Sequence, residues 1–98
     1  MTFRLRTPSG SEIAHAIDDN IDVIIELEDG RTFAATFFTI ANLQTLMRRY
    51  RLSGECAGGT YVWARDMIVV ETISYEIVEK TVADLLTSGE MENCCTQL

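Results

Sequence analysis

Few residues in this chain have the chemistry of a catalytic or metal-binding site. His15 is the only histidine, and Cys56, Cys94 and Cys95 form an odd set that cannot pair fully within one chain. A zinc site needs short, regular ligand spacings such as C-x-x-C, which these residues lack. A general base needs an oriented partner within hydrogen-bond reach, and one isolated histidine indicates none. We therefore predict no metal site, no cofactor and no catalytic residue, and we expect free thiols in a cytoplasmic protein.

The one basic cluster consists of Arg48, Arg49 and Arg51. Residues 42–65 hold four arginines against one glutamate, a local balance of +3 in a chain whose net charge is −7. The cluster could contact RNA phosphates or an acidic partner. However, the three side chains spread over about 160° of a helical wheel, and positive charges also suit a helix C-terminus. Because the acidic chain as a whole repels nucleic acid and anionic membranes, RNA contact through these arginines is the least favoured hypothesis.

A β-hairpin is predicted over residues 21–38. Apolar residues alternate from Ile21 to Leu27, and Asp29-Gly30, which favours a tight two-residue turn, follows them. A two-residue loop would place Ile24 opposite Ala35, and opposite residues share a face of the sheet. One face would then carry four apolar residues, which are Ile24, Phe33, Ala35 and Phe37.

Two helices are predicted, and the residues that cap their two ends have the same spacing in both. The first spans residues 40–52 between Thr39 and Gly54, and the second spans 75–88 between Ser74 and Gly89. Corresponding positions lie 35 residues apart, and an apolar β-rich stretch precedes each helix. This spacing suggests one ββα unit used twice.

The second β-rich stretch, residues 60–72, divides at Arg65-Asp66. We interpret it as a hairpin of 61–64 with 67–70, with one bulged strand as the alternative. The predicted fold is a single α+β domain over residues 1–98. It has two ββα units, a four-stranded mainly antiparallel sheet and two main helices. A short helix is expected near residues 13–17, and residues 1–10 and 91–98 are expected to be loosely ordered.

Both faces of the predicted sheet are apolar, although helices on one side should leave a polar free face. The 47% hydrophobic content of a chain of 98 residues therefore favours a covering partner. We predict a protein-interaction module that acts as a homodimer, with Ile24, Phe33, Ala35 and Phe37 at the interface. The net negative charge would also suit an immunity or antitoxin-like protein that blocks a basic nuclease. The alternative is a small-molecule binder or enzyme with a pocket near Tyr61, Trp63 and Cys56.

Three stretches of the chain resemble a group of small bacterial proteins of unknown function. They are Leu27–Arg31, Phe37–Gln44 and the region from Ser53-Gly54-Glu55-Cys56 through Trp63–Val70, within a resemblance that covers about residues 7–92. The resemblance implies a bacterial origin. It implies no activity and transfers no catalytic residue.

Overall fold

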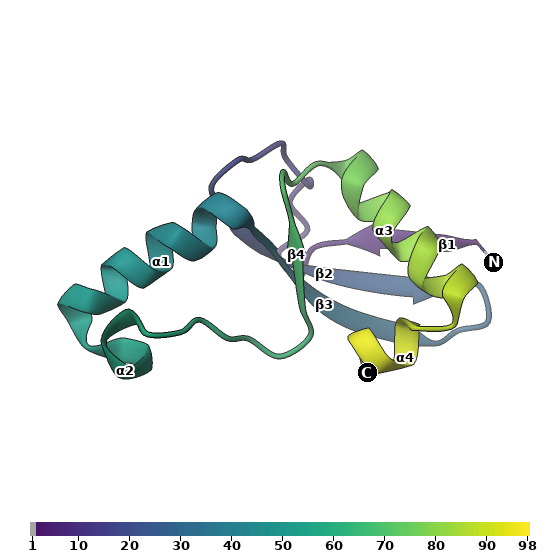
Figure 1. Cartoon of the computed structure of the whole chain (residues 1–98). Coiled ribbons are helices and arrows are strands. Elements are labelled where there is room, and N and C mark those ends of the chain that lie inside the picture. The colour runs from purple at the N-terminus through teal and green to yellow at the C-terminus, as the bar shows by residue number, and fades with distance from the viewer. Residues whose placement is uncertain (1) are drawn as a thin grey trace.

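The computed structural model describes residues 2–98. Met1, the first residue of the N-terminal segment that was expected to be loose, lies outside them. The elements follow one another as β1 (Phe3–Arg6), β2 (Asn20–Leu27), β3 (Thr32–Thr39), α1 (Ile40–Ser53), α2 (Glu55–Gly59), β4 (Met67–Val70), α3 (Tyr75–Ser88), α4 (Met91–Cys94) and β5 (Thr96–Gln97). The strands form one mostly antiparallel sheet in the order β1-β2-β3-β4, with β5 also pairing with β3 (Figure 1). The predicted α+β class and mainly antiparallel sheet are confirmed.

The first hairpin forms where it is predicted, but its register differs by one residue. Ile24 lies opposite Ala34 rather than Ala35. The cause is the turn, where the Gly30 N–H donates to the Leu27 carbonyl (3.0 Å) and the Leu27 N–H donates to the Arg31 carbonyl (2.9 Å). Gly30 is the only turn residue with a positive φ, 91°. This is a three-residue loop with a glycine bulge, whereas the predicted two-residue turn needs positive φ at both Asp29 and Gly30.

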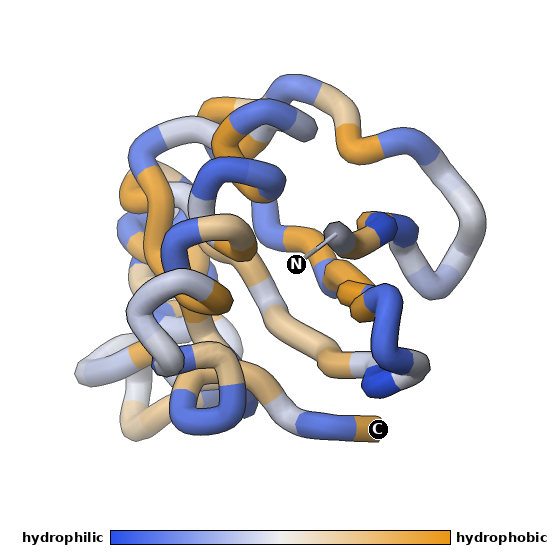
Figure 2. The backbone as a smooth tube through the Cα atoms, turned by 90° about the vertical axis from the view of Figure 1, so that its right-hand side faces the viewer, coloured by the Kyte–Doolittle hydropathy of each residue, from blue (hydrophilic) through white to orange (hydrophobic). Residues whose placement is uncertain are grey.

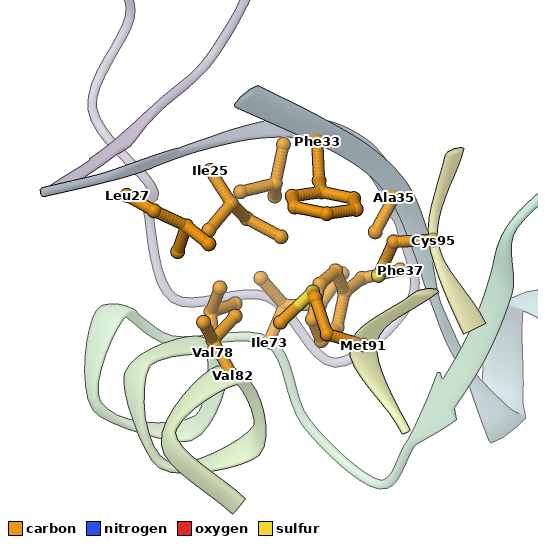
Figure 3. Packing of buried hydrophobic residues seen from close by; sticks show 11 residues of the cluster. Ile25, Leu27, Phe33, Ala35, Phe37, Ile73, Val78, Val82, Met91 and Cys95 are labelled. Atoms are coloured by element: carbon orange, nitrogen blue, oxygen red, sulfur yellow. The ribbon is translucent and has the colours of Figure 1, made fainter. Parts of the chain in front are cut away.

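The one-residue difference moves every side chain of β3 to the other face of the sheet. Phe33, Ala35 and Phe37 are 0%, 2% and 0% exposed and point into the core (Figure 3). They pack against Val78 and Val82 of α3, together with residues of α4 and the C-terminal tail. The register prediction is therefore wrong, and these three side chains do not form a surface that a partner could cover.

The opposite face of the sheet is mixed: it carries hydrogen-bonded polar side chains, and at one end also the buried Phe38 of β3. Arg6 Nε donates to Glu26 Oε1 at 3.0 Å, and Thr36 Oγ1 donates to Asp22 Oδ1 at 3.0 Å. Ile24 is the one predicted interface residue on this face, where it lies opposite Arg6 of β1. This face is less apolar than predicted, because the predicted register placed three buried residues of β3 on it.

The two helices form where they are predicted, and each has 14 residues. The Thr39 hydroxyl accepts a hydrogen bond from the backbone N–H three residues on (3.1 Å), and Ser74 does the same (3.2 Å). Gly54 and Gly89 end the helices in the left-handed conformation. The spacing of 35 residues therefore holds for both helices and both sets of caps.

The second predicted hairpin is absent from the described residues. Residues 61–64 are not a strand, and β4 pairs in parallel with β3, with Phe37 opposite Ile68. Parallel neighbours need a long crossover connection, which α1 and α2 provide here. The sequence pattern identified β4 correctly but gave it the wrong partner.

Two segments that were expected to be helical or loosely ordered are held by β-type pairing. No helix forms at residues 13–17; instead Ala16 and Ile73 exchange two backbone hydrogen bonds of 2.9 Å. At the C-terminus, β5 pairs with β3, and Met91 and Cys95 are buried in the core. The C-terminal tail was expected to be loosely ordered. Burial of its apolar residues and pairing of β5 with β3 hold it in place.

Candidate interaction surface

Residues 40–65 project from the molecule as an arm, and the remaining described residues form the body. No described residue of the arm belongs to the main hydrophobic cluster of the core or packs against it, although Leu46 of α1 is buried at 8% exposure. The molecule measures 45 × 25 × 24 Å, and its radius of gyration is 14.2 Å, against about 13 Å for a compact domain of this length. Figure 1 shows α1 and α2 at the end of the molecule opposite α3. Helix α1 therefore lies outside the main core cluster, and Leu46 is its buried apolar residue.

A polar network holds the base of the arm to the loop before β2. Asn42 is buried, and its Nδ2 donates to Asp18 Oδ1 at 2.9 Å. The second carboxylate oxygen of Asp18 accepts from Thr45 Oγ1 at 2.7 Å, and Asn20 Nδ2 donates to Asn42 Oδ1 at 2.8 Å. These bonds lower the pKa of Asp18, chiefly the one from Thr45 and then the one from Asn42. The network sets the direction in which α1 leaves the body.

The Asp18 network predicts a pH-dependent stability. Because the pKa of Asp18 is lower in the folded chain than in the unfolded chain, its carboxylate stabilises the fold above about pH 4. That contribution is lost as the pH falls through the folded-state pKa. We expect Asp18→Asn to lower the Tm at pH 7 and to flatten the fall in Tm between about pH 5 and about pH 3. Thermal melts across this range should show no such flattening for Asp84→Asn, a control whose carboxylate accepts no hydrogen bond from the described residues.

A left-handed turn closes the tip of the arm. Within α2, Cys56, Ala57 and Gly58 have φ values of 49°, 52° and 68° with positive ψ. Each of the two non-glycine residues costs about 1–2 kcal/mol in this conformation. Gly59 follows with φ 83° and is buried against α1, where an added Cβ would lie 2.3 Å from the Met47 carbonyl oxygen. The contact with α1 thus holds a strained turn that reverses the chain.

The returning segment, residues 60–65, exposes two large aromatic side chains. Trp63 is 68% exposed and Tyr61 is 48% exposed, while Val62 and Ala64 between and beside them are half-buried. The backbone groups of residues 61–65 make no hydrogen bond to any described residue. At the end of α1, Leu52 is 92% exposed. The arm therefore combines exposed apolar side chains with unpaired backbone groups.

Charge is divided between the arm and the body. The arm holds four arginines against one glutamate, so it carries +3 of a net −7 and leaves −10 on the rest of the chain. The predicted cluster of Arg48, Arg49 and Arg51 lies exposed on α1, and one Arg48 guanidinium nitrogen donates to Thr45 Oγ1 at 3.3 Å. The structure thus places the predicted arginine cluster on the arm.

The predicted pocket near Tyr61, Trp63 and Cys56 receives no support from the cavities. Four well-formed surface cavities occur among residues 2–98, and none of the four is lined by these residues. The first has a volume of about 480 Å³ and lies between Arg31, Leu86 and Glu92. Its arginine already donates to Asp29 and Glu92, at 2.9 and 3.0 Å. This cavity therefore offers no free cation to an anionic ligand.

The thiols and the histidine do not form a reactive centre in the described residues. Burial raises the pKa of Cys95 to about 11, with smaller contributions from Cys94 and Asp66. Its thiol stays protonated at neutral pH, which is the unreactive form. His15 is exposed, and among residues 2–98 no three histidine, cysteine or acidic side chains converge as metal ligands.

Apolar residues are distributed in short runs rather than in one long stretch. In the end view of Figure 2, hydrophobic and hydrophilic residues alternate along the chain. None of the helices in the described residues has the length and hydrophobicity needed to cross a membrane.

The arm is the feature that sequence reasoning missed. Its signals were the β-favouring residues Tyr61–Ala64 and the local balance of +3, but each was assigned to a different role. Comparisons of the chain with protein-family models, with curated proteins and with solved structures give no match.

Proposed function

We propose that the protein is a cytoplasmic interaction module that acts as a homodimer, and that the arm forms the dimer contact. The observation that carries this proposal is the exposure of Tyr61 and Trp63 on a segment whose backbone groups are unpaired. Exposed aromatic side chains gain free energy when a partner covers them, and free backbone groups offer that partner hydrogen bonds. Tyrosine and tryptophan are also the side chains enriched at the centres of interfaces.

The division of charge supports a second copy as that partner. The arm has a net charge of +3 and the body a net charge of −10, so the two attract each other. Each copy of the chain has both an arm and a body. A two-fold axis makes such contacts reciprocal, because the arm of each copy then faces the body of the other. The electrostatic attraction favours this orientation over body against body.

The dimer is tested by the mass in solution. Sedimentation or light scattering should give twice the mass of one 11.0 kDa chain. Tyr61→Asp combined with Trp63→Asp should give the single-chain mass with an unchanged circular dichroism spectrum, because both side chains are exposed in one chain. Ile17→Asp is the matched control, since Ile17 is 63% exposed but lies on the body, and this variant should remain a dimer. A wild-type mass of one chain, or a double variant that stays dimeric, contradicts the proposal.

A second candidate function, an immunity or antitoxin-like role, is favoured by the charge of the body. The body has a net charge of −10, and a surface that carries most of this negative charge would attract a basic protein such as a nuclease. The check is direct binding between this chain and the purified product of an adjacent gene. Affinity that falls steeply as salt rises supports the role, and absence of binding at low salt argues against it.

A further inference from the structure

We infer that the arm binds single-stranded nucleic acid, with bases stacked on Tyr61 and Trp63 and phosphates bound by arginines of the arm. This inference goes beyond the proposed homodimer and does not rest on it. Proteins that bind single strands combine exposed aromatic side chains, on which bases stack, with positive charges that follow the phosphate backbone. The arm has both features, because its two exposed aromatic residues accompany a net charge of +3.

The two aromatic side chains lie on one side of the returning segment. From Tyr61 to Arg65, exposed and half-buried residues alternate, which is the two-residue period of an extended chain. In such a chain, side chains two residues apart face the same way and are separated by about 6–7 Å. In Figure 1 the segment runs from α2 at the tip of the arm back to β4, apart from the sheet. Unpaired bases can therefore reach the rings of Tyr61 and Trp63.

Arginines lie at both ends of this aromatic pair. Arg65 is two residues after Trp63, on the same exposed side of the segment. At the other end, a Cβ added to Gly59 would lie 3.1 Å from the Cγ atom of Arg51, so the Arg51 side chain starts beside the turn that leads to Tyr61. Neither Arg51 nor Arg65 forms a salt bridge with a described residue, so both guanidinium groups can bind phosphate.

The acidic body does not prevent binding at the arm. Arg51 lies about 16 Å along the axis of α1 from Ile40, the first residue of the helix. Salt screens charges over about 8 Å at physiological ionic strength, so the −10 of the body acts only weakly on a phosphate near the tip. Repulsion by the body then confines the nucleic acid to the arm. A duplex presents no unpaired bases to the aromatic pair, which is why the surface suits a single strand.

Tryptophan fluorescence of the unmodified chain tests the stacking directly, because Trp63 is the only tryptophan. At protein concentrations where no second copy covers the arm, oligouridylate and oligothymidylate of about ten nucleotides should both be tried. We expect quenching by at least one of them at low salt, with an affinity that falls as salt rises. The comparison of the two identifies RNA or DNA as the preferred ligand.

Polyglutamate of equal charge is the control for charge alone, and it should bind more weakly than the oligonucleotides and leave the fluorescence unchanged. Absence of quenching by both oligonucleotides at low salt overturns the inference. Equal binding of polyglutamate also overturns it, and would indicate an acidic protein segment as the ligand of the arm.

Tyr61→Ala tests whether the second aromatic residue also stacks on a base. Loss of one stacked base should weaken binding of a labelled oligonucleotide, measured by fluorescence anisotropy, roughly 5- to 150-fold. Tyr75→Ala is the matched control, because Tyr75 is 47% exposed against 48% for Tyr61 but lies on α3 of the body. This variant should bind like the wild type, and equal affinities of the two variants contradict stacking on Tyr61.

Arg65→Gln tests the phosphate contact. A plot of the logarithm of the binding constant against the logarithm of the salt concentration should lose about 0.7 from its slope for each phosphate contact removed. Arg4→Gln, at an exposed arginine of the body, should leave the slope unchanged. A dimer that binds no oligonucleotide after dilution to single chains overturns this inference alone, whereas a protein of single-chain mass that binds oligonucleotide overturns the homodimer alone.

Discussion

Phe37→Asp is expected to prevent folding. Phe37 is fully buried at the centre of the sheet, and removing a buried phenylalanine side chain typically costs about 3–5 kcal/mol. A buried carboxylate adds a further penalty, because nothing in the core of apolar residues would pair with it. A domain of this size has a total stability of only about 5–15 kcal/mol. Circular dichroism and urea titration should therefore show a chain without a cooperative unfolding transition.

Ile24→Asp is the control for this prediction. Ile24 lies on the open face and is only partly buried, so a new carboxylate there can reach water. We expect this variant to fold with a change in stability of less than about 1 kcal/mol. The predicted register placed both residues on one partner-facing surface, so it requires both variants to fold and to lose the dimer. A stable, folded Phe37→Asp chain would contradict the observed register.

Gly59→Ala is expected to destabilise the protein by about 2–4 kcal/mol. An alanine Cβ would lie 2.3 Å from the Met47 carbonyl oxygen, which is helix backbone and cannot move alone. The left-handed φ of 83° adds about 1–2 kcal/mol of strain for any residue with a Cβ. The chain should relieve the clash by moving the turn away from α1, and the returning segment that follows would move with it, so the dimer should also weaken.

Gly58→Ala separates the clash from the strain. Gly58 has φ 68°, but an added Cβ there meets no atom within 4 Å. Only the left-handed strain remains, about 1–2 kcal/mol, and the dimer should persist. Urea unfolding of the two variants measures the difference, and sedimentation measures the dimer. If the two alanine variants lose the same stability, the contact between the turn and α1 is not what holds the arm together.

The register shows what a local pattern can and cannot determine. Asp29-Gly30 correctly placed the first turn, since glycine supplies the positive φ that a tight reversal needs. The same dipeptide suits a two-residue turn and a three-residue loop with a bulge, and the two differ by one residue in pairing. That single residue decided which side of β3 is buried, and with it the predicted interface of Phe33, Ala35 and Phe37.

Long-range pairing was harder to predict than the elements themselves. The caps of α1 and α3 are local hydrogen bonds, so Thr39 and Ser74 identified both helices correctly. Which strand β4 pairs with depends on the direction in which α1 leaves the sheet. That direction depends on the hydrogen bond between Asp18 and Asn42, which are 24 residues apart in the sequence. Propensity alone contains no information about such a contact.

The sequence predicted the residues of the candidate surface but assigned them to two separate sites. Tyr61 and Trp63 were assigned to a pocket, and the arginines of α1 to a separate anion contact. The structure places all of them on one arm, because the left-handed turn, whose Gly59 packs against α1, reverses the chain toward β4. The pattern of exposure that identifies them as a surface depends on the absence of core contacts, which only the fold reveals.

The anchoring of α1 at one end makes the arm a lever. A helix of 14 residues is about 21 Å long, so a tilt of about 10° at its base moves its tip by about 4 Å. The hydrogen bonds of Asp18 and Asn42 hold the base of α1, at the opposite end of the arm from its tip. Substitutions there would redirect the whole contact surface without altering any residue in it.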